Sequence, residues 1–262
     1  MPPRILVIAG SDCSAGAGIQ ADLKTAFAFG VYAQTAVTAV TVQNTLGVTG
    51  VHAVPPKIVR DQIIACLTDI GADAIKTGML VSADMVAMVA RTLAAYAPQI
   101  PLVVDPVMVA KGGSRLIDEK AVATLREKLL PMANLVTPNL PEAEALTCFD
   151  ASNEAGLKAA LAAFAGMGCK HILFKGGHAE GPVVEDVLGN GETGNLLRLS
   201  APRRDTRHTH GTGCTLATAI ACGLAEHLSL AEAVGRAHRY VQRAIAGAPG
   251  LGQGHGPLNH KV

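Results

Sequence analysis

The stretch His210-Gly211-Thr212-Gly213-Cys214 leads directly into the apolar run 215–221. Two glycines before a run of small apolar residues predict the first turns of a buried helix. The unpaired N–H groups at such a helix start can bind an anion. A second glycine-rich stretch, Gly16-Ala17-Gly18-Ile19-Gln20-Ala21-Asp22-Leu23-Lys24, lies near the amino end. Together the two stretches suggest a phosphate donor site that faces a small-molecule acceptor site.

Apolar and amphipathic segments alternate along the rest of the chain. Apolar, β-branched residues predict strands at residues 4–9, 35–42, 73–77, 101–105, 135–137 and 171–175. Helical periodicity predicts helices at residues 19–29, 58–70, 83–96, 119–130 and 154–167. This alternation indicates an α/β fold with a mainly parallel central sheet flanked by helices. Residues 183–188 and 194–199 are expected to form an antiparallel edge hairpin, with Asn190-Gly191 at its turn.

Length and composition exclude several classes of protein. The 262 residues contain no linker, charge block or repeat, so we expect a single domain over residues 1–262. A net charge of +1 gives no electrostatic case for nucleic acid or a membrane surface as a partner. The absence of a signal-peptide core or a long apolar run favours a cytoplasmic protein. The six cysteines form no CxxC pair, so neither a disulfide framework nor a structural zinc site is expected.

Two common nucleotide-binding motifs do not fit. Residues 16–21 match the G-x-G-x-x-G/A pattern, but no acidic residue between Asp22 and Asp61 is available to bind a ribose. A dinucleotide oxidoreductase is therefore disfavoured. The sequence also contains no Gly-Lys dipeptide, which a P-loop requires. If ATP binds, it binds without a P-loop.

Polar residues stand at the end of three consecutive predicted strands or directly after it. They are Asp105, the pair Asn139 and Glu142, and Lys175 with its two following glycines. Ligands of parallel sheets bind at the carboxyl ends of the strands, so these side chains could hold Mg²⁺ and phosphates. Each has a plainer explanation as a turn residue, an ordinary helix start or a surface turn. Three such coincidences are harder to explain by turns alone.

The ordered set of motifs resembles the hydroxymethylpyrimidine/phosphomethylpyrimidine kinase family, within the ribokinase-like superfamily. The resemblance runs from Ala9 to Asn259 and rests on residues 9–12, 16–24, 42–45, 76–80, 105–108, 137–144, 175–178 and 209–216. It implies a three-layer sandwich in one domain. The implied activity transfers the γ-phosphoryl of Mg-ATP to 4-amino-5-hydroxymethyl-2-methylpyrimidine, and then converts that monophosphate to the diphosphate in thiamine biosynthesis. A homodimer is implied as well. Cys13, Ala15 and Thr77 depart from the residues expected for the family.

The resemblance also assigns site residues. Gln43 is expected to bind the pyrimidine, because its amide can both donate to and accept from an aminopyrimidine edge. Met79, Val107 and Gly10 are expected to line the ring site, and Asp22 to lie at the hydroxymethyl group. Lys175, Asn139, Gly211 and Gly213 are implied to bind ATP, and Asp105 and Glu142 to bind Mg²⁺. The plainer alternatives are a loop role for Gln43, core packing for Met79 and an exposed helix charge for Asp22.

Cys214 stands where most ribokinase-like kinases carry an aspartate base. The resemblance therefore implies that Cys214 takes the proton of the acceptor hydroxyl, while the N–H groups of Gly211, Thr212 and Gly213 receive the developing charge. The helix start is expected to favour the thiolate and to make it a base near neutral pH. A buried cysteine at a helix start is the alternative.

Two other functions stay open at this point. A pyridoxal or pyridoxine kinase would share the fold and the phosphate chemistry but accept a pyridine. A non-catalytic pyrimidine-binding regulator would not need Asp105, Lys175 and Cys214, all of which are present.

Overall fold

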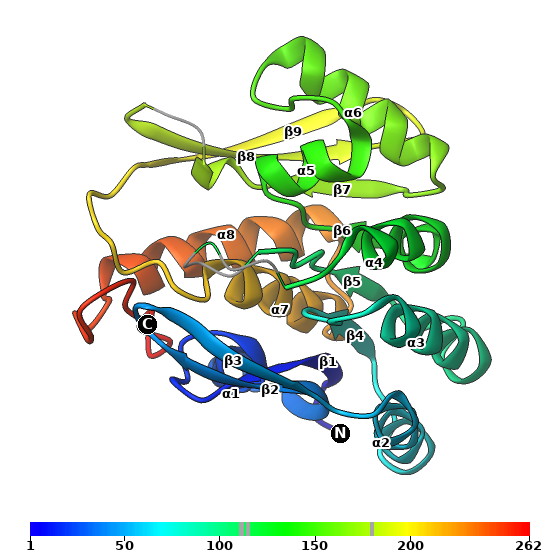
Figure 1. The fold of residues 1–262 in the computed structure, drawn as a ribbon. Coiled ribbons are helices and arrows are strands. Elements are labelled where there is room, and N and C mark those ends of the chain that lie inside the picture. The colour runs from blue at the N-terminus through cyan, green and yellow to red at the C-terminus, as the bar shows by residue number, and fades with distance from the viewer. Residues whose placement is uncertain (110–112, 114–115, 179–180) are drawn as a thin grey trace.

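One mixed sheet of nine strands forms the centre of the protein (Figure 1). The structure is a computed structural model and describes residues 1–109, 113, 116–178 and 181–262. The strand order is β3-β2-β1-β4-β5-β6-β7-β8-β9. The strands are β1 (Arg4–Asp12), β2 (Tyr32–Asn44), β3 (Gly47–Ala53), β4 (Ala74–Thr77), β5 (Leu102–Val104), β6 (Leu135–Val136), β7 (His171–Phe174), β8 (Val183–Asn190) and β9 (Leu196–Pro202). In this spatial order, all neighbouring strands between β2 and β7 are parallel. Strand β3 at one edge and strands β8 and β9 at the other edge pair antiparallel.

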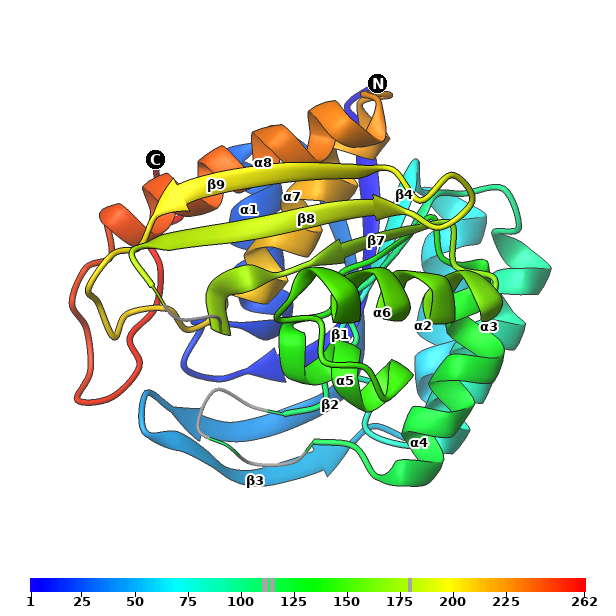
Figure 2. The same ribbon diagram turned by 90° about the horizontal axis from the view of Figure 1, so that it is seen from above.

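Helices cover both faces of the sheet, which gives three layers (Figure 2). One face carries α2 (Pro56–Asp69), α3 (Ala83–Tyr96), α4 (Glu119–Thr124), α5 (Leu140–Thr147) and α6 (Glu154–Gly166). The opposite face carries α1 (Gly18–Ala28), α7 (Thr212–Ala225) and α8 (Leu230–Ala246). Short helical turns lie at Leu125–Leu129, Leu130–Met132 and Gly176–His178.

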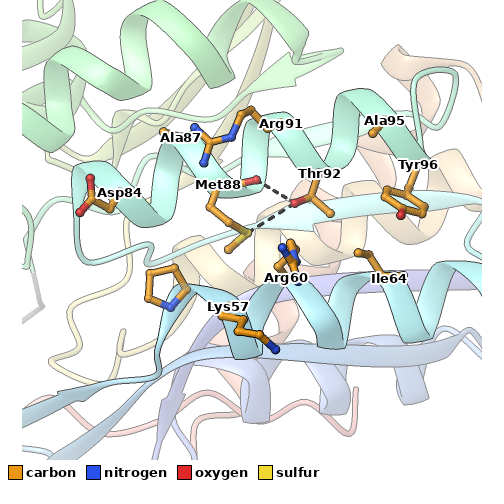
Figure 3. A pocket seen from close by; sticks show the side chains of 11 residues that line it. Lys57, Arg60, Ile64, Asp84, Ala87, Met88, Arg91, Thr92, Ala95 and Tyr96 are labelled. Carbon is orange, nitrogen blue, oxygen red and sulfur yellow. Dashed lines mark hydrogen bonds between the residues drawn. The ribbon is translucent and has the colours of Figure 1, made fainter.

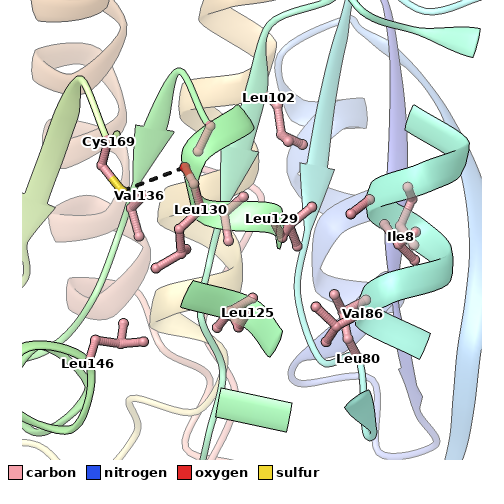
Figure 4. Close-up of a cluster of buried hydrophobic side chains, with 14 of the residues drawn as sticks. Ile8, Leu80, Val86, Leu102, Leu125, Leu129, Leu130, Val136, Leu146 and Cys169 are labelled. Carbon is pink, nitrogen blue, oxygen red and sulfur yellow. Dashed lines mark hydrogen bonds between the residues drawn. The ribbon is translucent and has the colours of Figure 1, made fainter. Parts of the chain in front are cut away.

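Alternation along the central strands divides the core in two. In β1, Leu6 and Ile8 belong to the core under α2 and α3, while Ile5 and Val7 belong to the core under α1 and α7. Successive side chains of a strand point to opposite faces, so a strand covered on both faces must be apolar at every position. Figure 4 shows the first of these cores, in which Ile8, Leu102 and Val136 meet side chains of the helical layer. This two-sided burial explains the continuous apolar runs that predict the parallel strands.

The structure confirms the predicted α/β sandwich with its mainly parallel sheet. It lengthens β1 and β2, and it adds β3 and α8, which were not among the predicted elements. It also contains α5, whose start at Asn139 and Glu142 was considered from the sequence only as an alternative. The predicted helix at 119–130 ends its α-helical part at Thr124 and continues as a π-helical turn. The edge hairpin is present, but its chain reversal is longer than a two-residue turn at Asn190-Gly191, because Asn190 N–H donates to the Asn195 carbonyl at 2.9 Å. In the described part of the chain, no helix is both long and apolar enough to cross a lipid bilayer.

Candidate active site

The carboxyl ends of the parallel strands open into a cleft of about 1070 Å³. Because consecutive parallel strands end at the same edge of the sheet, the residues that follow them converge. Every predicted site residue except Asp22 lines this cleft: Gly10, Gln43, Met79, Val107, Asp105, Asn139, Glu142, Lys175, Gly211, Thr212, Gly213 and Cys214. Gln43 and Cys214, which lie far apart in the sequence, therefore share one cavity.

A lysine and two carboxylates form the charged centre of the cleft. Lys175 Nζ lies 2.8 Å from Asp105 Oδ1 and 3.8 Å from Glu142 Oε2. Burial opposes the lysine charge, but the two carboxylates outweigh it and raise the pKa of Lys175 above its ordinary value. Burial raises the pKa of Glu142, against the opposing effect of Lys175. The ammonium thus stays charged beside two acids that are almost withdrawn from water.

The pair Asn139 and Glu142 also forms the start of α5. Asn139 Oδ1 accepts the Glu142 N–H at 2.9 Å, and Glu142 Oε2 accepts the Asn139 N–H at 2.8 Å. This reciprocal arrangement is a capping box, which satisfies two otherwise unpaired donors of the helix. The ordinary helix start considered from the sequence is therefore real, and it holds both side chains at the rim of the cleft.

Helix α7 begins beside the charged centre of the cleft. Its N-cap Gly211 has φ +84°, and no side chain in the described part of the chain caps this helix. A Cβ at Gly211 would lie 1.9 Å from the Gly16 carbonyl, so the two glycine-rich stretches pack backbone against backbone. A Cβ at Gly213 would lie 3.2 Å from Lys175 Nζ. The uncapped helix start therefore faces the charged centre, as an anion site requires.

The expectation that the start of α7 makes the Cys214 thiolate a base near neutral pH is wrong. Burial raises the pKa of the Cys214 thiol to about 11, with Lys76 opposing the shift and Asp22 adding to it. The helix start was expected to favour the thiolate, but loss of water around the sulfur outweighs that effect. Cys214 is predominantly a neutral thiol near pH 7 in this structure.

The expected contact between Asp22 and the substrate also needs correction. Asp22 is fully buried and does not line the cleft. Its oxygens each lie 3.1 Å from Lys76 Nζ, and Oδ1 accepts the Thr218 hydroxyl at 2.6 Å. Lys76, which was not singled out from the sequence, lines the cleft and binds Asp22. In this structure the carboxylate of Asp22 is bonded to Lys76 and Thr218 and is not exposed to the cleft.

A group of hydrogen bonds around Asp12 and His210, both of which line the cleft, was also missed from the sequence. Asp12 accepts the N–H groups of Ser14, Gly16 and Ala17 and the Nε2 group of His210, at 2.8 to 3.2 Å. Burial opposes this ionised form, but the bonds from His210 and Ser14 lower the pKa of Asp12 to about 2. Three arginines after β9, at positions 203, 204 and 207, line the cleft as well. The clustering of arginines after the predicted hairpin was the available sequence signal.

A second hollow, of about 860 Å³, lies between α2 and α3 (Figure 3). Its lining includes Lys57 and Arg60, which both pair with Asp61, and the Thr92 hydroxyl, which bonds to Met88. None of the predicted site residues lines it. Of these two cavities, only the larger cleft is lined by the predicted site residues at the strand ends.

The charged centre fits a magnesium ion that is shared with phosphates. Within the described ranges, no cluster of three or more His, Cys, Asp or Glu side chains is placed to hold a metal. Asp105 and Glu142 still supply two carboxylates on one wall of the cleft. Mg²⁺ is commonly bound by one or two carboxylates together with substrate phosphates and water. The donor set is therefore complete only when a phosphorylated ligand is present.

A helix start open to phosphates beside a half-buried lysine and two carboxylates suits the transfer of a phosphoryl group between two small molecules. On the ribokinase-like sheet described above, this cleft defines a small-molecule kinase, a phosphotransferase. The chain belongs to the phosphomethylpyrimidine kinase family, whose model matches residues 12–259.

Similar proteins agree with this assignment. The chain is 49% identical to the thiamine biosynthesis bifunctional protein ThiED of Geobacter sulfurreducens over 98% of its own length, but spans only 52% of that protein. It is 48% identical to the hydroxymethylpyrimidine/phosphomethylpyrimidine kinase of Streptomyces coelicolor, covering 99% of this chain and 94% of that one. The pyridoxal kinase of Bacillus subtilis, solved with ADP, superposes with a TM-score of 0.91 at 34% identity and covers 99% of this chain and 98% of that chain.

Proposed function

We propose that the protein uses ATP to phosphorylate 4-amino-5-hydroxymethyl-2-methylpyrimidine, and then converts the monophosphate to the diphosphate, in thiamine biosynthesis. The observation that carries the proposal is the shared cleft, in which Gln43 lies with Lys175 and Cys214. A group suited to an aminopyrimidine and groups suited to phosphates thus face one cavity. The similarity to the Streptomyces kinase over nearly both chains supports the same substrate.

The acceptor would bind at the amino-terminal side of the cleft. Gln43 presents an amide to the amine and ring nitrogen of the pyrimidine. Met79 and Val107 supply apolar walls, and Gly10 lets the ring approach closely, because a Cβ there would lie 3.3 Å from Met79 Sδ. Asp22 holds Lys76 in place behind this part of the cleft. The result is an apolar slot with one polar edge.

The donor would bind across the charged centre. Lys175 neutralises the phosphates, and Asn139 holds Glu142 at the same wall. The N–H groups of Gly211, Thr212 and Gly213 receive the negative charge that develops on the transferred group. Asp105 and Glu142 would hold Mg²⁺, which when bound neutralises the phosphate oxygens. The charge of the transferred group is thus balanced by the lysine, by the start of α7 and by the bound metal.

Cys214 is proposed to take the proton of the acceptor hydroxyl. A neutral thiol cannot accept that proton, so the thiolate, a minority at neutral pH, is the reactive form. Phosphoryl transfer has a loose transition state, in which little proton transfer is needed before the bond to phosphorus forms. Alignment of the hydroxyl and neutralisation of the phosphates therefore contribute more than the strength of the base.

A second candidate is a pyridoxal kinase, because the ADP-bound pyridoxal kinase superposes on nearly the whole chain. The two functions are separated by competition. Purified protein is given ATP with equal amounts of hydroxymethylpyrimidine and pyridoxal, and the phosphorylated products are quantified by mass spectrometry. We expect the pyrimidine to dominate. Preferred phosphorylation of pyridoxal would overturn the substrate assignment, and loss of ATP turnover with both acceptors would favour the non-catalytic regulator.

We further propose that the protein works in the cytoplasm as a homodimer and as one domain over residues 1–262. The cytoplasm supplies ATP and keeps scattered thiols reduced, and the described cysteines are all unpaired. Light scattering coupled to gel filtration tests the dimer, and a protected fragment shorter than the chain in limited proteolysis would argue against a single domain.

A further inference from the structure

We propose that His210 is a positioning residue that sets the orientation of the Gln43 side-chain amide, and through it the order of donor and acceptor offered to the acceptor molecule. The proposal rests on the proposed function, because it names how that site selects its substrate. Both residues line the cleft, and His210 Nε2 lies 3.3 Å from the Gln43 amide nitrogen Nε2.

The first step concerns the partner of His210. Its Nε2 lies 2.8 Å from Asp12 Oδ2. That carboxylate also accepts backbone N–H groups from residues 14, 16 and 17, so it acts only as an acceptor. His210 Nε2 must therefore carry a hydrogen and donate it to Asp12. This holds whether the imidazole ring is neutral or charged.

A nitrogen that carries a hydrogen has no free lone pair, so His210 Nε2 cannot accept from Gln43. With the amide nitrogen facing it, two donors would meet. Turning the amide by 180° brings the Gln43 carbonyl oxygen to His210 Nε2. The single Nε2–H can then donate to both this oxygen and the Asp12 carboxylate. Histidine and amide orientations are set by such networks of partners. The Asp12–His210 pair thus favours the reversed amide.

The other side of the amide gives an independent argument. Thr41 Oγ1 lies 3.0 Å from the Gln43 amide atom placed as Oε1, and 3.1 Å from the Ser11 carbonyl oxygen. A hydroxyl has one hydrogen, and the Ser11 carbonyl can only accept. In the reversed amide, Thr41 donates to Ser11 and accepts an N–H from Gln43, so every group is satisfied. Thr41 and His210 therefore favour the same orientation from opposite sides.

The oriented amide keeps one carbonyl lone pair and one N–H for a ligand. A 4-aminopyrimidine offers an amine donor beside a ring-nitrogen acceptor, which matches this pair. The 4-oxo analogue, 5-hydroxymethyl-2-methylpyrimidin-4-one, offers the reverse order, an oxygen acceptor beside an N–H donor. An amide that turned freely would bind either molecule. An amide held by His210 and Thr41 rejects the oxo analogue.

The test compares kcat/KM for the amino and oxo pyrimidines with ATP. Since a matched bidentate amide contact discriminates by about 1–3 kcal/mol, we expect the wild type to prefer the amino form by roughly 10- to 100-fold. Thr41→Val and His210→Leu should each lower this preference at least about fivefold, while His52→Leu, an exposed histidine on β3, should leave it unchanged. An unchanged preference in both folded variants would overturn the proposal.

A second measurement does not depend on catalysis or on folding of the variants. In NMR spectra of the unliganded wild type, a hydrogen should be bound to His210 Nε2, and the Gln43 side-chain NH₂ should show a nuclear Overhauser contact to the Thr41 methyl group. Contacts from that NH₂ to the His210 ring instead of Thr41 would overturn the proposal. If neither pyrimidine is phosphorylated, the proposed function fails, and this measurement alone decides the orientation of the amide.

Discussion

Replacing Lys76 with methionine should destabilise the protein strongly. Lys76 and Asp22 have no exposed side-chain surface, and Lys76 Nζ is 3.1 Å from both carboxylate oxygens. Removing one partner of a buried ion pair leaves an uncompensated charge and typically costs about 3–5 kcal/mol. The Thr218 hydroxyl remains on Asp22 in the variant, so we expect the lower half of that range. Because small domains are stable by only about 5–15 kcal/mol, this loss is easily measured.

The assay is urea unfolding at pH 7.5, with Lys57→Met as the matched control. Lys57 pairs with Asp61 on the surface, where its side chain is 73% exposed, so the same substitution should change stability far less. The double variant Asp22→Leu/Lys76→Met removes both charges and should recover at least half of the loss. An equal midpoint for Lys76→Met and Lys57→Met would refute the reasoning.

The pH dependence of that loss has a definite sign. Burial already raises the pKa of Asp22, even with Lys76 opposing it. Without Lys76 the folded-state pKa of Asp22 rises further above its unfolded value, so the folded protein binds more protons than the unfolded chain. The Lys76→Met deficit should therefore shrink as the pH falls toward 5. A deficit that grows on acidification would contradict the buried pair.

Three further outcomes are expected. Cys214→Ala should lower turnover by roughly 10²- to 10⁴-fold with little change in ATP affinity, and unchanged steady-state turnover would remove its role as the base. The rate at which iodoacetamide alkylates Cys214, followed by mass spectrometry, should rise about tenfold per pH unit from pH 7 to 10. Below the pKa of about 11, the thiolate fraction rises by that factor with each pH unit. A plateau near pH 8 would show an activated thiol instead. Gln43→Leu should weaken pyrimidine binding by about 1–3 kcal/mol, and equal affinities in calorimetry would exclude the amide contact.

The positions of the site residues around the cleft could be predicted from the sequence because they depend on the strands. Asp105, Asn139 and Lys175 each follow a parallel strand, and parallel strands end at one edge. Their convergence thus follows from recognising the strands and their common direction. The same holds for the glycines before α7, whose backbone freedom is visible in the sequence.

The environment of the side chains could not be predicted in this way. Asp22 resembles an exposed helix charge until Lys76 of β4, 54 positions away, is placed against it. The pKa of Cys214 depends on burial and on the charges of Asp22, Lys76 and Asp105, which lie far from it in the sequence, whereas the helix start that favours its thiolate is local. Helix α8 was missed although Ser229 and Glu232 form a capping box at its start, so there the sequence signal was present.

Phosphorus NMR of the reaction between ATP and hydroxymethylpyrimidine tests the central claim most directly. If the cleft brings the pyrimidine alcohol to the γ-phosphate, a pyrimidine monophosphate signal should appear first and then give way to a diphosphate, while ADP accumulates in step. ADP formed with no phosphorus signal from the pyrimidine, or no consumption of ATP at all, would contradict the account.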